Sequence, residues 1–223
     1  LLMKSSLQAA EYVLYEPEQI QYKSQIYQGV KSNSFLSDDW QIVTLERLFK
    51  TICNESLTSM VWRIPEVEDR LKFLTDQVER ITGLQEFGVY LNKLFTIDAI
   101  FLNEDRHMHN IAVMMNGKGE FDYCPIFDNG GALLTDTTMD YPLDQDELLL
   151  MKEVHAKTIS SDFDEQLDAS EHFYGRNLRF SFTKKDVERL LAKPELNMYD
   201  MRIRTRVANI FYQQMNKYKY LFY

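Results

Sequence analysis

The sequence predicts an α+β fold in which helices predominate, and three observations support this class. Apolar residues recur at helical spacing over most of the chain. Two short apolar runs flank an Asn-Gly loop at residues 116–120, which is typical of a β-hairpin. Hydrophobic residues make up 45% and charged residues 26% of the 223 residues, close to the averages for soluble globular proteins. Disordered and fibrous classes are therefore disfavoured.

The first forty residues are predicted to hold one helix end and two strands. Residues 1–10 fit the tail of a helix, and residues 11–15 have the aromatic and β-branched content of a strand. Glu16-Pro17-Glu18 breaks the periodicity, and a second strand is predicted at residues 27–35. N-cap residues then precede a helix that is expected to begin near Trp40.

The middle of the chain is predicted to be two helices followed by the hairpin. Apolar stripes indicate helices at residues 66–82 and 84–102. Asp98 lies on the apolar face of the second helix, so its carboxylate needs a partner, and the polar loop that follows offers one. The hairpin strands are expected at residues 111–115 and 121–127.

The remainder is predicted to be helical with one irregular stretch. An acidic helix is expected at residues 143–154, followed by a mobile stretch rich in Ser, Asp and Glu at residues 160–171. One helix opens at Thr183, and a last one spans residues 199–223. This last helix is locally basic, which we interpret as a solvated or salt-bridged face made by Arg202, Arg204 and Arg206.

The charge and the cysteine content limit the kinds of binding partner and cell compartment that we expect. Lys and Arg number 25 against 34 Asp and Glu, a net charge of −9 that argues against direct nucleic-acid or membrane binding. No apolar run is long enough for a membrane span, and the start does not resemble a signal peptide. Cys53 and Cys124 are interpreted as reduced thiols in a cytoplasm. The first residue is Leu, as in a trimmed or incomplete piece of a longer product.

The densest polar cluster, residues 103–110, lies between the long apolar helix and the hairpin. After the hairpin the chain reaches Asp128-Asn129-Gly130-Gly131, so the fold of the hairpin returns a carboxylate beside the first loop. We therefore expect Asp105, Asn110 and Asp128 to converge on one site.

Phosphoryl transfer needs this set of side chains. Asp105 is suited to accept the proton of an incoming hydroxyl group, and the oxygens of Asn110 and Asp128 are suited to hold magnesium. The Asp-to-Asn spacing of five and the Asp-x-Gly after the hairpin both occur in kinase active sites.

Asn103-x-Asp105-x-His107-x-x-Asn110, followed by Pro125-Ile126-Phe127-Asp128, resembles the HipA-like serine/threonine kinases, the toxins of bacterial toxin-antitoxin modules. The catalytic loop also resembles that of phosphoinositide and related lipid kinases. The resemblance implies an ATP- and magnesium-dependent protein kinase. Asp105 would be the catalytic base, Asn110 and Asp128 the magnesium ligands, and His107 the residue that fixes the loop.

The resemblance also divides the chain and suggests partners. Residues 1–37 would be a remnant of the amino-terminal kinase lobe, and residues 38–223 the helical carboxy-terminal lobe. Ser32 to Phe35 would contact the adenine base through backbone groups. Arg106 would pair with a carboxylate such as Asp98 or meet a phosphate. A protein substrate and an antitoxin-like protein are the implied partners.

The sequence departs from a complete kinase before Asp105. No Gly-rich phosphate loop is present. The lysines that precede the catalytic loop and are considered for phosphate binding are Lys4, Lys23 and Lys31. They are poor candidates because none lies on a strand that is followed by a Glu-bearing helix. A pseudokinase or split-kinase binding module that needs a missing amino-terminal lobe is therefore a second hypothesis.

Two further interpretations remain open. His107 and His109 have a spacing that can present two imidazoles to zinc, with Asp105 or Asp128 adding oxygen ligands, as in a metal-dependent hydrolase. Alternatively, the polar cluster only caps a helix, and the Gly-Gly segment is a plain turn.

Overall fold

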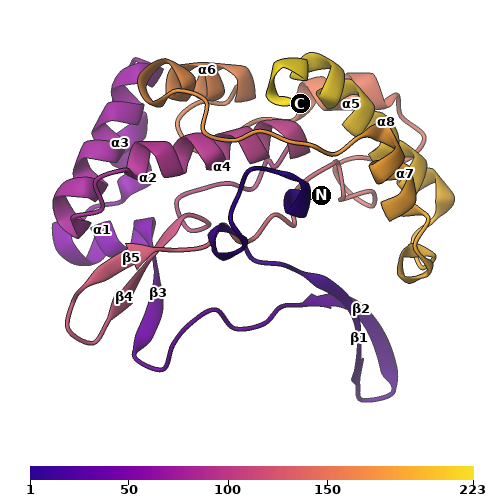
Figure 1. Ribbon diagram of the computed structural model, residues 1–223, viewed down its shortest axis with the longest axis horizontal. Coiled ribbons are helices and arrows are strands. Elements are labelled where there is room, and N and C mark those ends of the chain that lie inside the picture. The colour runs from indigo at the N-terminus through magenta and orange to yellow at the C-terminus, as the bar shows by residue number, and fades with distance from the viewer.

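The computed structural model describes residues 1–223 and has an α+β fold in which helices predominate, as predicted (Figure 1). The strands are β1 (Glu16–Tyr22), β2 (Gln25–Lys31), β3 (Trp40–Thr44), β4 (Ala112–Asn116) and β5 (Phe121–Tyr123). The helices are α1 (Leu45–Cys53), α2 (Leu57–Trp62), α3 (Val67–Thr82), α4 (Phe87–Phe101), α5 (Glu147–Glu153), α6 (Phe163–Tyr174), α7 (Lys184–Leu191) and α8 (Met201–Lys217). None of the helices is long and apolar enough to cross a membrane.

Helix α4 runs through the middle of the molecule and contacts α3, α6 and α8 (Figure 1). Most of its residues are buried, including the polar Asn92 and Asp98. Asn92 donates from Nδ2 to Oγ of Ser170 on α6 over 3.0 Å and accepts the Asn177 backbone N–H over 3.0 Å. Helix α6 comes close because Gly88 has no side chain, since a Cβ there would lie 2.3 Å from the Tyr174 ring.

Two separate antiparallel sheets complete the fold. β1 and β2 form a hairpin with no further strand, and the other sheet has the order β3-β4-β5. In the latter, Trp40 pairs with Asn116 and Thr44 pairs with Ala112. The predicted hairpin is confirmed as β4 and β5, although β5 ends at Tyr123 and not at residue 127, and β3 extends it to three strands.

The amino-terminal residues differ from the prediction. Residues 1–10 do not end a helix but contain two short 3-10 turns, at Leu2–Lys4 and Ala9–Glu11. Residues 11–15 are not a strand of a sheet. They make a single parallel bridge between Tyr12 and Ile126, which explains their β-type composition. Earlier in the segment, Ser5 bridges to Phe180, and Phe180 also bridges to Phe222.

The first hairpin begins where a break was expected. Pro17 lies within β1 opposite Val30, and a two-stranded hairpin tolerates proline because each strand has a free edge. The predicted second strand at residues 27–35 is shifted, since β2 ends at Lys31 and residues 32–39 form an irregular connection.

No helix begins near Trp40, because residues 40–44 form strand β3 and pair with β4. Helix α1 starts at Leu45, directly after this strand. The side chain of Thr44 is its N-cap and accepts the Arg47 N–H. Leu45, Leu48 and Phe49 form its buried face as predicted.

The later helices mostly confirm the prediction. The helices predicted at residues 66–82 and 84–102 correspond to α3 and α4, and Thr183 caps α7 as expected. The stretch 160–171, predicted to be mobile, instead contains most of α6, whose Phe163 and Leu167 are buried. Its Asp162 side chain caps the helix by accepting two backbone N–H groups, so the acidic composition starts the helix rather than disrupting it.

Candidate active site

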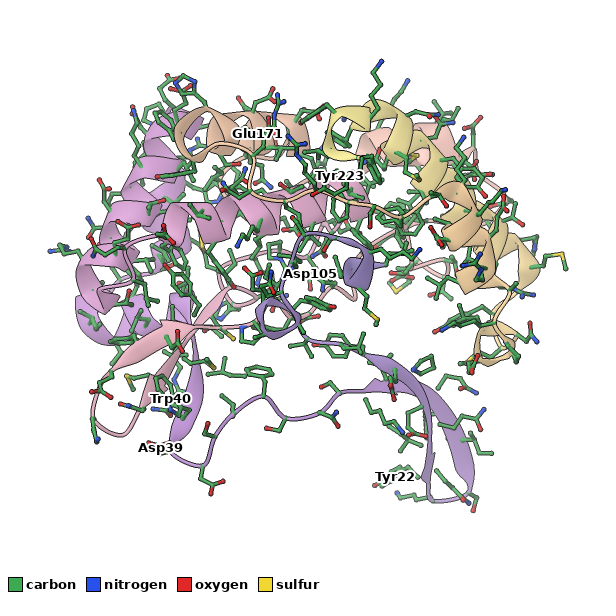
Figure 2. The ribbon with its side chains drawn as sticks, in the orientation of Figure 1. Tyr22, Asp39, Trp40, Asp105, Glu171 and Tyr223 are labelled. Atoms are coloured by element: carbon green, nitrogen blue, oxygen red, sulfur yellow. The ribbon has the colours of Figure 1, made fainter.

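The Asp105 loop, residues 103–110, connects α4 to β4 and lies between the helices and the sheets (Figure 2). Helix α4 ends at Phe101, and the C-cap residue Leu102 has a left-handed backbone conformation with φ of 49°. Within the loop, the His107 N–H donates to the Asp105 carbonyl over 3.0 Å, and the Asn110 N–H donates to the His107 carbonyl over 2.8 Å. These bonds fold the loop into a compact turn.

A buried ion pair holds the Asp105 loop to α4. Arg106 Nε lies 3.1 Å from Asp98 Oδ2, and both side chains are at most 1% exposed. Asn103 Nδ2 donates to Asp98 Oδ1 over 2.9 Å. Burial raises the pKa of the Asp98 carboxyl group, while Arg106 and Asn103 favour its ionised form. The predicted pairing of Asp98 with Arg106 is confirmed.

Arg106 also joins the Asp105 loop to the Asp128 loop, residues 127–131. Its Nη1 donates to the carbonyls of Asn110, over 3.0 Å, and Phe127, over 2.7 Å. Its Nη2 donates to the Asn129 side-chain oxygen. A fully bonded guanidinium therefore fixes the two loops relative to each other.

Backbone contacts bring the same two loops still closer. The Glu104 N–H donates to the Gly131 carbonyl over 3.0 Å. A Cβ on Gly131 would lie 2.6 Å from Asp105 Cβ, so only glycine fits there without a shift. The structure thus places the loops that carry Asp105, Asn110 and Asp128 side by side, as the hairpin geometry predicts.

Asp105 and Asn110 are in direct contact. Asn110 Nδ2 donates to the Asp105 carbonyl over 2.9 Å and to Asp105 Oδ2 over 3.3 Å. The Asp105 side chain is 47% exposed, so its carboxylate is accessible to a substrate. Because Nδ2 makes both bonds, Oδ1 of Asn110 remains available to a cation.

His107 lies beside Asp105. Its Nδ1 accepts the His109 backbone N–H over 3.3 Å, which leaves the ring proton on Nε2. Nε2 lies 3.5 Å from Asp105 Oδ1, within the distance of an ion pair. The contact is consistent with a role in orienting Asp105.

The histidines do not form a zinc site. The rings of His107 and His109 meet edge to face with centroids 5.7 Å apart. No group of three or more His, Cys, Asp or Glu side chains is placed to hold a metal ion. Catalytic zinc sites have three protein ligands, so the geometry does not support the His-ligated hydrolase.

Asp128 has an unusual backbone conformation, with φ of 52°, and its side chain is exposed. Its N–H donates to the Tyr15 hydroxyl group over 3.3 Å. Its carboxylate makes no salt bridge within the chain. One carboxylate and one neutral amide oxygen suit Mg²⁺, which usually binds few protein groups and completes its shell with water and phosphate. The donor set of Asn110 and Asp128 therefore fits magnesium.

Several residues that support the loops were not predicted. The Thr158 hydroxyl donates to the Arg106 carbonyl over 2.6 Å, and the Tyr141 hydroxyl donates to Glu104 Oε2 over 2.8 Å. Arg206 is buried and donates to the Tyr141 carbonyl over 2.6 Å, so its interpretation as part of a solvated or salt-bridged face was wrong. These contacts join distant parts of the chain and have no local sequence signal.

A cavity of about 220 Å³ lies between residues 9–16 and residues 31–35. Pro125, three residues before Asp128, forms part of its wall. The predicted adenine-contacting residues Ser32 to Phe35 all line this cavity.

No family model and no curated protein sequence matches the chain. Among solved structures, a proinflammatory kinase of Helicobacter pylori, CtkA, superposes with a TM-score of 0.60. The two chains are 16% identical, and the match covers 92% of this chain and 78% of that chain. At this identity the likeness shows a kinase-like fold.

Proposed function

We propose that this protein is a HipA-like serine/threonine kinase, which transfers a phosphoryl group from ATP to a protein hydroxyl group in the presence of magnesium. The observation that carries the proposal is the bonding of one Arg106 guanidinium to both the Asp105 loop and the Asp128 loop within a kinase-like fold. A structural turn has no need for two polar loops held together in this way.

Each residue in these loops has a distinct role in the proposed reaction. Asp105 accepts the proton of the substrate hydroxyl group, because its carboxylate is half exposed and needs no rearrangement to be reached. His107 and the Asn110 amide nitrogen orient that carboxylate. Asn110 Oδ1 and the Asp128 carboxylate hold magnesium, which when bound neutralises charge on the transferring phosphoryl group.

The adenine base would occupy the cavity lined by Ser32 to Phe35. Backbone groups of an irregular segment are free to bond a base because they are not used by a sheet. The location of this cavity next to the segment leading to Asp128 supports the assignment.

On the resemblance to HipA-like kinases alone, we extend the proposal to the partners and the cell compartment. It covers a protein substrate, an antitoxin-like protein, a cytoplasmic location and no direct nucleic-acid or membrane binding. The division into an amino-terminal lobe remnant, residues 1–37, and a carboxy-terminal lobe, residues 38–223, belongs to the same proposal.

A second candidate function is a kinase-like binding module that needs a further lobe. It is favoured by the positions of the three lysines considered for the phosphates. Lys4 pairs with Asp186 on α7, and Lys31 pairs with Glu18 within the first hairpin. Lys23 lies in the turn between β1 and β2, over the Tyr22 ring. None of the three contacts the Asp105 or Asp128 loop.

Calorimetric titration with ATP, with and without magnesium, tests the metal site. We expect magnesium-dependent binding that Asp128→Ala abolishes, because the change removes a ligand and a charge. Asp39→Ala is the matched control, since Asp39 is exposed and far from Asp105 (Figure 2). An Asp128→Ala variant that binds ATP and magnesium like the wild type would contradict the site.

Phosphoryl transfer from labelled ATP then separates the two candidates. For a kinase, Asp105→Ala lowers the transfer rate about 10²- to 10⁴-fold and preserves nucleotide binding, because it removes the base alone. Nucleotide binding without transfer in the wild type would favour the binding module.

A further inference from the structure

The amino-terminal segment, residues 1–15, runs beside the stretch that leads from β5 to Asp128. The Val13 N–H donates to the Ile126 carbonyl over 2.9 Å, and the Ile126 N–H donates to the Glu11 carbonyl over 2.8 Å. These paired bonds fix the register of the two segments. Tyr12 is the bridge partner of Ile126, and this register brings Tyr15, three residues beyond Tyr12, within hydrogen-bond reach of Asp128, two residues beyond Ile126.

The amino-terminal segment is itself anchored to the helices. Lys4 pairs with Asp186 on α7 over 2.8 Å, and Glu11 pairs with Lys93 on α4. Leu7 and Val13 are buried. The position of Tyr15 is thus determined by contacts along the whole segment.

Asp128 needs support of this kind. A φ of 52° is disfavoured for any residue with a Cβ, so surrounding contacts have to hold it. On one side Arg106 binds the Phe127 carbonyl and the Asn129 side chain. On the other side the Tyr15 hydroxyl accepts the Asp128 N–H over 3.3 Å. The backbone conformation at Asp128 determines where its carboxylate points.

We propose that Tyr15 is a positioning residue for magnesium binding, whose hydroxyl group holds the Asp128 backbone so that the carboxylate faces the site. The effect on magnesium binding rests on the proposed function, whereas the support of the Asp128 backbone by Tyr15 rests on the geometry alone. It assigns to the amino-terminal segment a role in the active site, besides its packing on the helices.

Tyr15→Phe tests the inference because it removes only the hydroxyl group. We expect the affinity for ATP in the presence of magnesium to fall about fivefold, as for the loss of one hydrogen bond. The affinity for ATP without magnesium and the melting temperature should not change, which a merely structural role would not predict. Tyr27→Phe is the control, because the Tyr27 hydroxyl bonds only Gln25 within the exposed hairpin. Equal magnesium-dependent affinity in Tyr15→Phe and the wild type would overturn the inference.

A second readout separates this inference from the proposed function. Hydrogen exchange of the Asp128 backbone amide should become faster in Tyr15→Phe and stay unchanged in Tyr27→Phe. If the wild type binds no ATP with magnesium, the proposed function fails, and amide exchange alone decides the positioning role. An unchanged exchange rate at Asp128 would then overturn it.

Discussion

At the scale of single residues, Arg106 is the side chain on which the geometry of the site depends most. It pairs with Asp98 inside the helical core and bonds both polar loops. Lysine has one point charge in place of a planar group with five donors, so it cannot reproduce these bonds. The Arg106–Asp98 ion pair fixes the positions of the two loops. Removing only one of the two side chains should lower the free energy of unfolding strongly.

Asp98→Ala should therefore destabilise the protein by about 3–5 kcal/mol, because it leaves the buried Arg106 cation without its only carboxylate. The free energy of unfolding in urea measures the effect. Asp39→Ala, at an exposed position, is the control. A loss of about 1 kcal/mol or less, the range of surface pairs, would contradict the buried pair.

Gly131→Ala should disturb the site through a steric clash. The new Cβ would lie 2.6 Å from Asp105 Cβ, so one of the two loops must move. We expect a destabilisation of about 1–3 kcal/mol and weaker magnesium-dependent ATP binding, measured by thermal unfolding and calorimetry. Gly117→Ala is the matched control, since no atom lies within 4 Å of its added Cβ. Equal behaviour of the two variants would count against the close approach of the loops.

The pairing of Asp98 with Arg106 was predictable because a charge on an apolar helix face needs a partner and the next loop supplies one. Thr158 and Tyr141 were not predictable as supports. They lie 52 and 37 residues from their partners Arg106 and Glu104, and neither is marked by its neighbours in the sequence. Tyr15 was not predictable for the same reason, being 113 residues from Asp128.

At the scale of secondary-structure elements, α7 anchors the amino-terminal segment through Asp186. This carboxylate accepts the Thr183 N–H and hydroxyl group in a capping box and pairs with Lys4. These contacts hold the pKa of Asp186 well below its usual range.

The lowered pKa of Asp186 predicts in which direction the stability of the protein changes with pH. The stabilisation by Asp186 is present above the pKa of about 4 that an unfolded Asp has, and is lost as the pH falls toward the folded value. Asp186→Asn should therefore lower the melting temperature at pH 7, and the difference from the wild type should shrink below about pH 4. Thermal unfolding at pH 7, 4 and 3 measures it, with Asp39→Asn as the control. A difference as large at pH 3 as at pH 7 would refute the charge pairing.

Elements with strong local periodicity were predictable, and those fixed by distant partners were not. Helices α3 and α4 carry continuous apolar stripes. Residues 40–44 fit a helical pattern together with α1, but β4, about 70 residues later, pairs with them as a strand. Helix α6 looked mobile because its exposed residues are acidic, whereas the cap at Asp162 and packing on α4 stabilise it.

At the scale of the whole molecule, the β1–β2 hairpin projects away from the rest of the chain, with Tyr22 near its far end (Figures 1 and 2). It contributes no residue to the hydrophobic core. Its apolar side chains are 49–65% exposed: Ile20, Tyr22, Ile26, Tyr27 and Val30. An isolated two-stranded hairpin is marginally stable in water.

Limited trypsin digestion should therefore cut first after Lys23, in the turn of this hairpin. We expect the cut protein to keep its melting temperature, because the core is untouched. Mass spectrometry of early fragments and thermal unfolding of the product measure both expectations. Lys23→Gln should remove the early fragments. First cleavage within a helix would show that the hairpin is better protected than its exposure indicates.

The fold class and the kinase-like fold were predictable because the Asp105 loop, the hairpin and the Asp128 loop are consecutive in sequence. The packing of the amino-terminal segment was not, because its partners lie at Ile126 and Phe180, far along the chain. The chain shares a kinase-like fold with CtkA although the two sequences are only 16% identical, so this fold requires few identical residues.

The bridges that Phe180 makes to Ser5 and Phe222 have a consequence for biosynthesis. The residues around Ser5 leave the ribosome well before Phe180, which is synthesised 175 residues later. At a translation rate of about 5–20 residues per second, the segment around Ser5 waits roughly 9 to 35 seconds before it can dock. Until then it is a target for chaperones and proteases. Docking of the segment around Ser5 is therefore completed only after the chain has been made as far as Phe180.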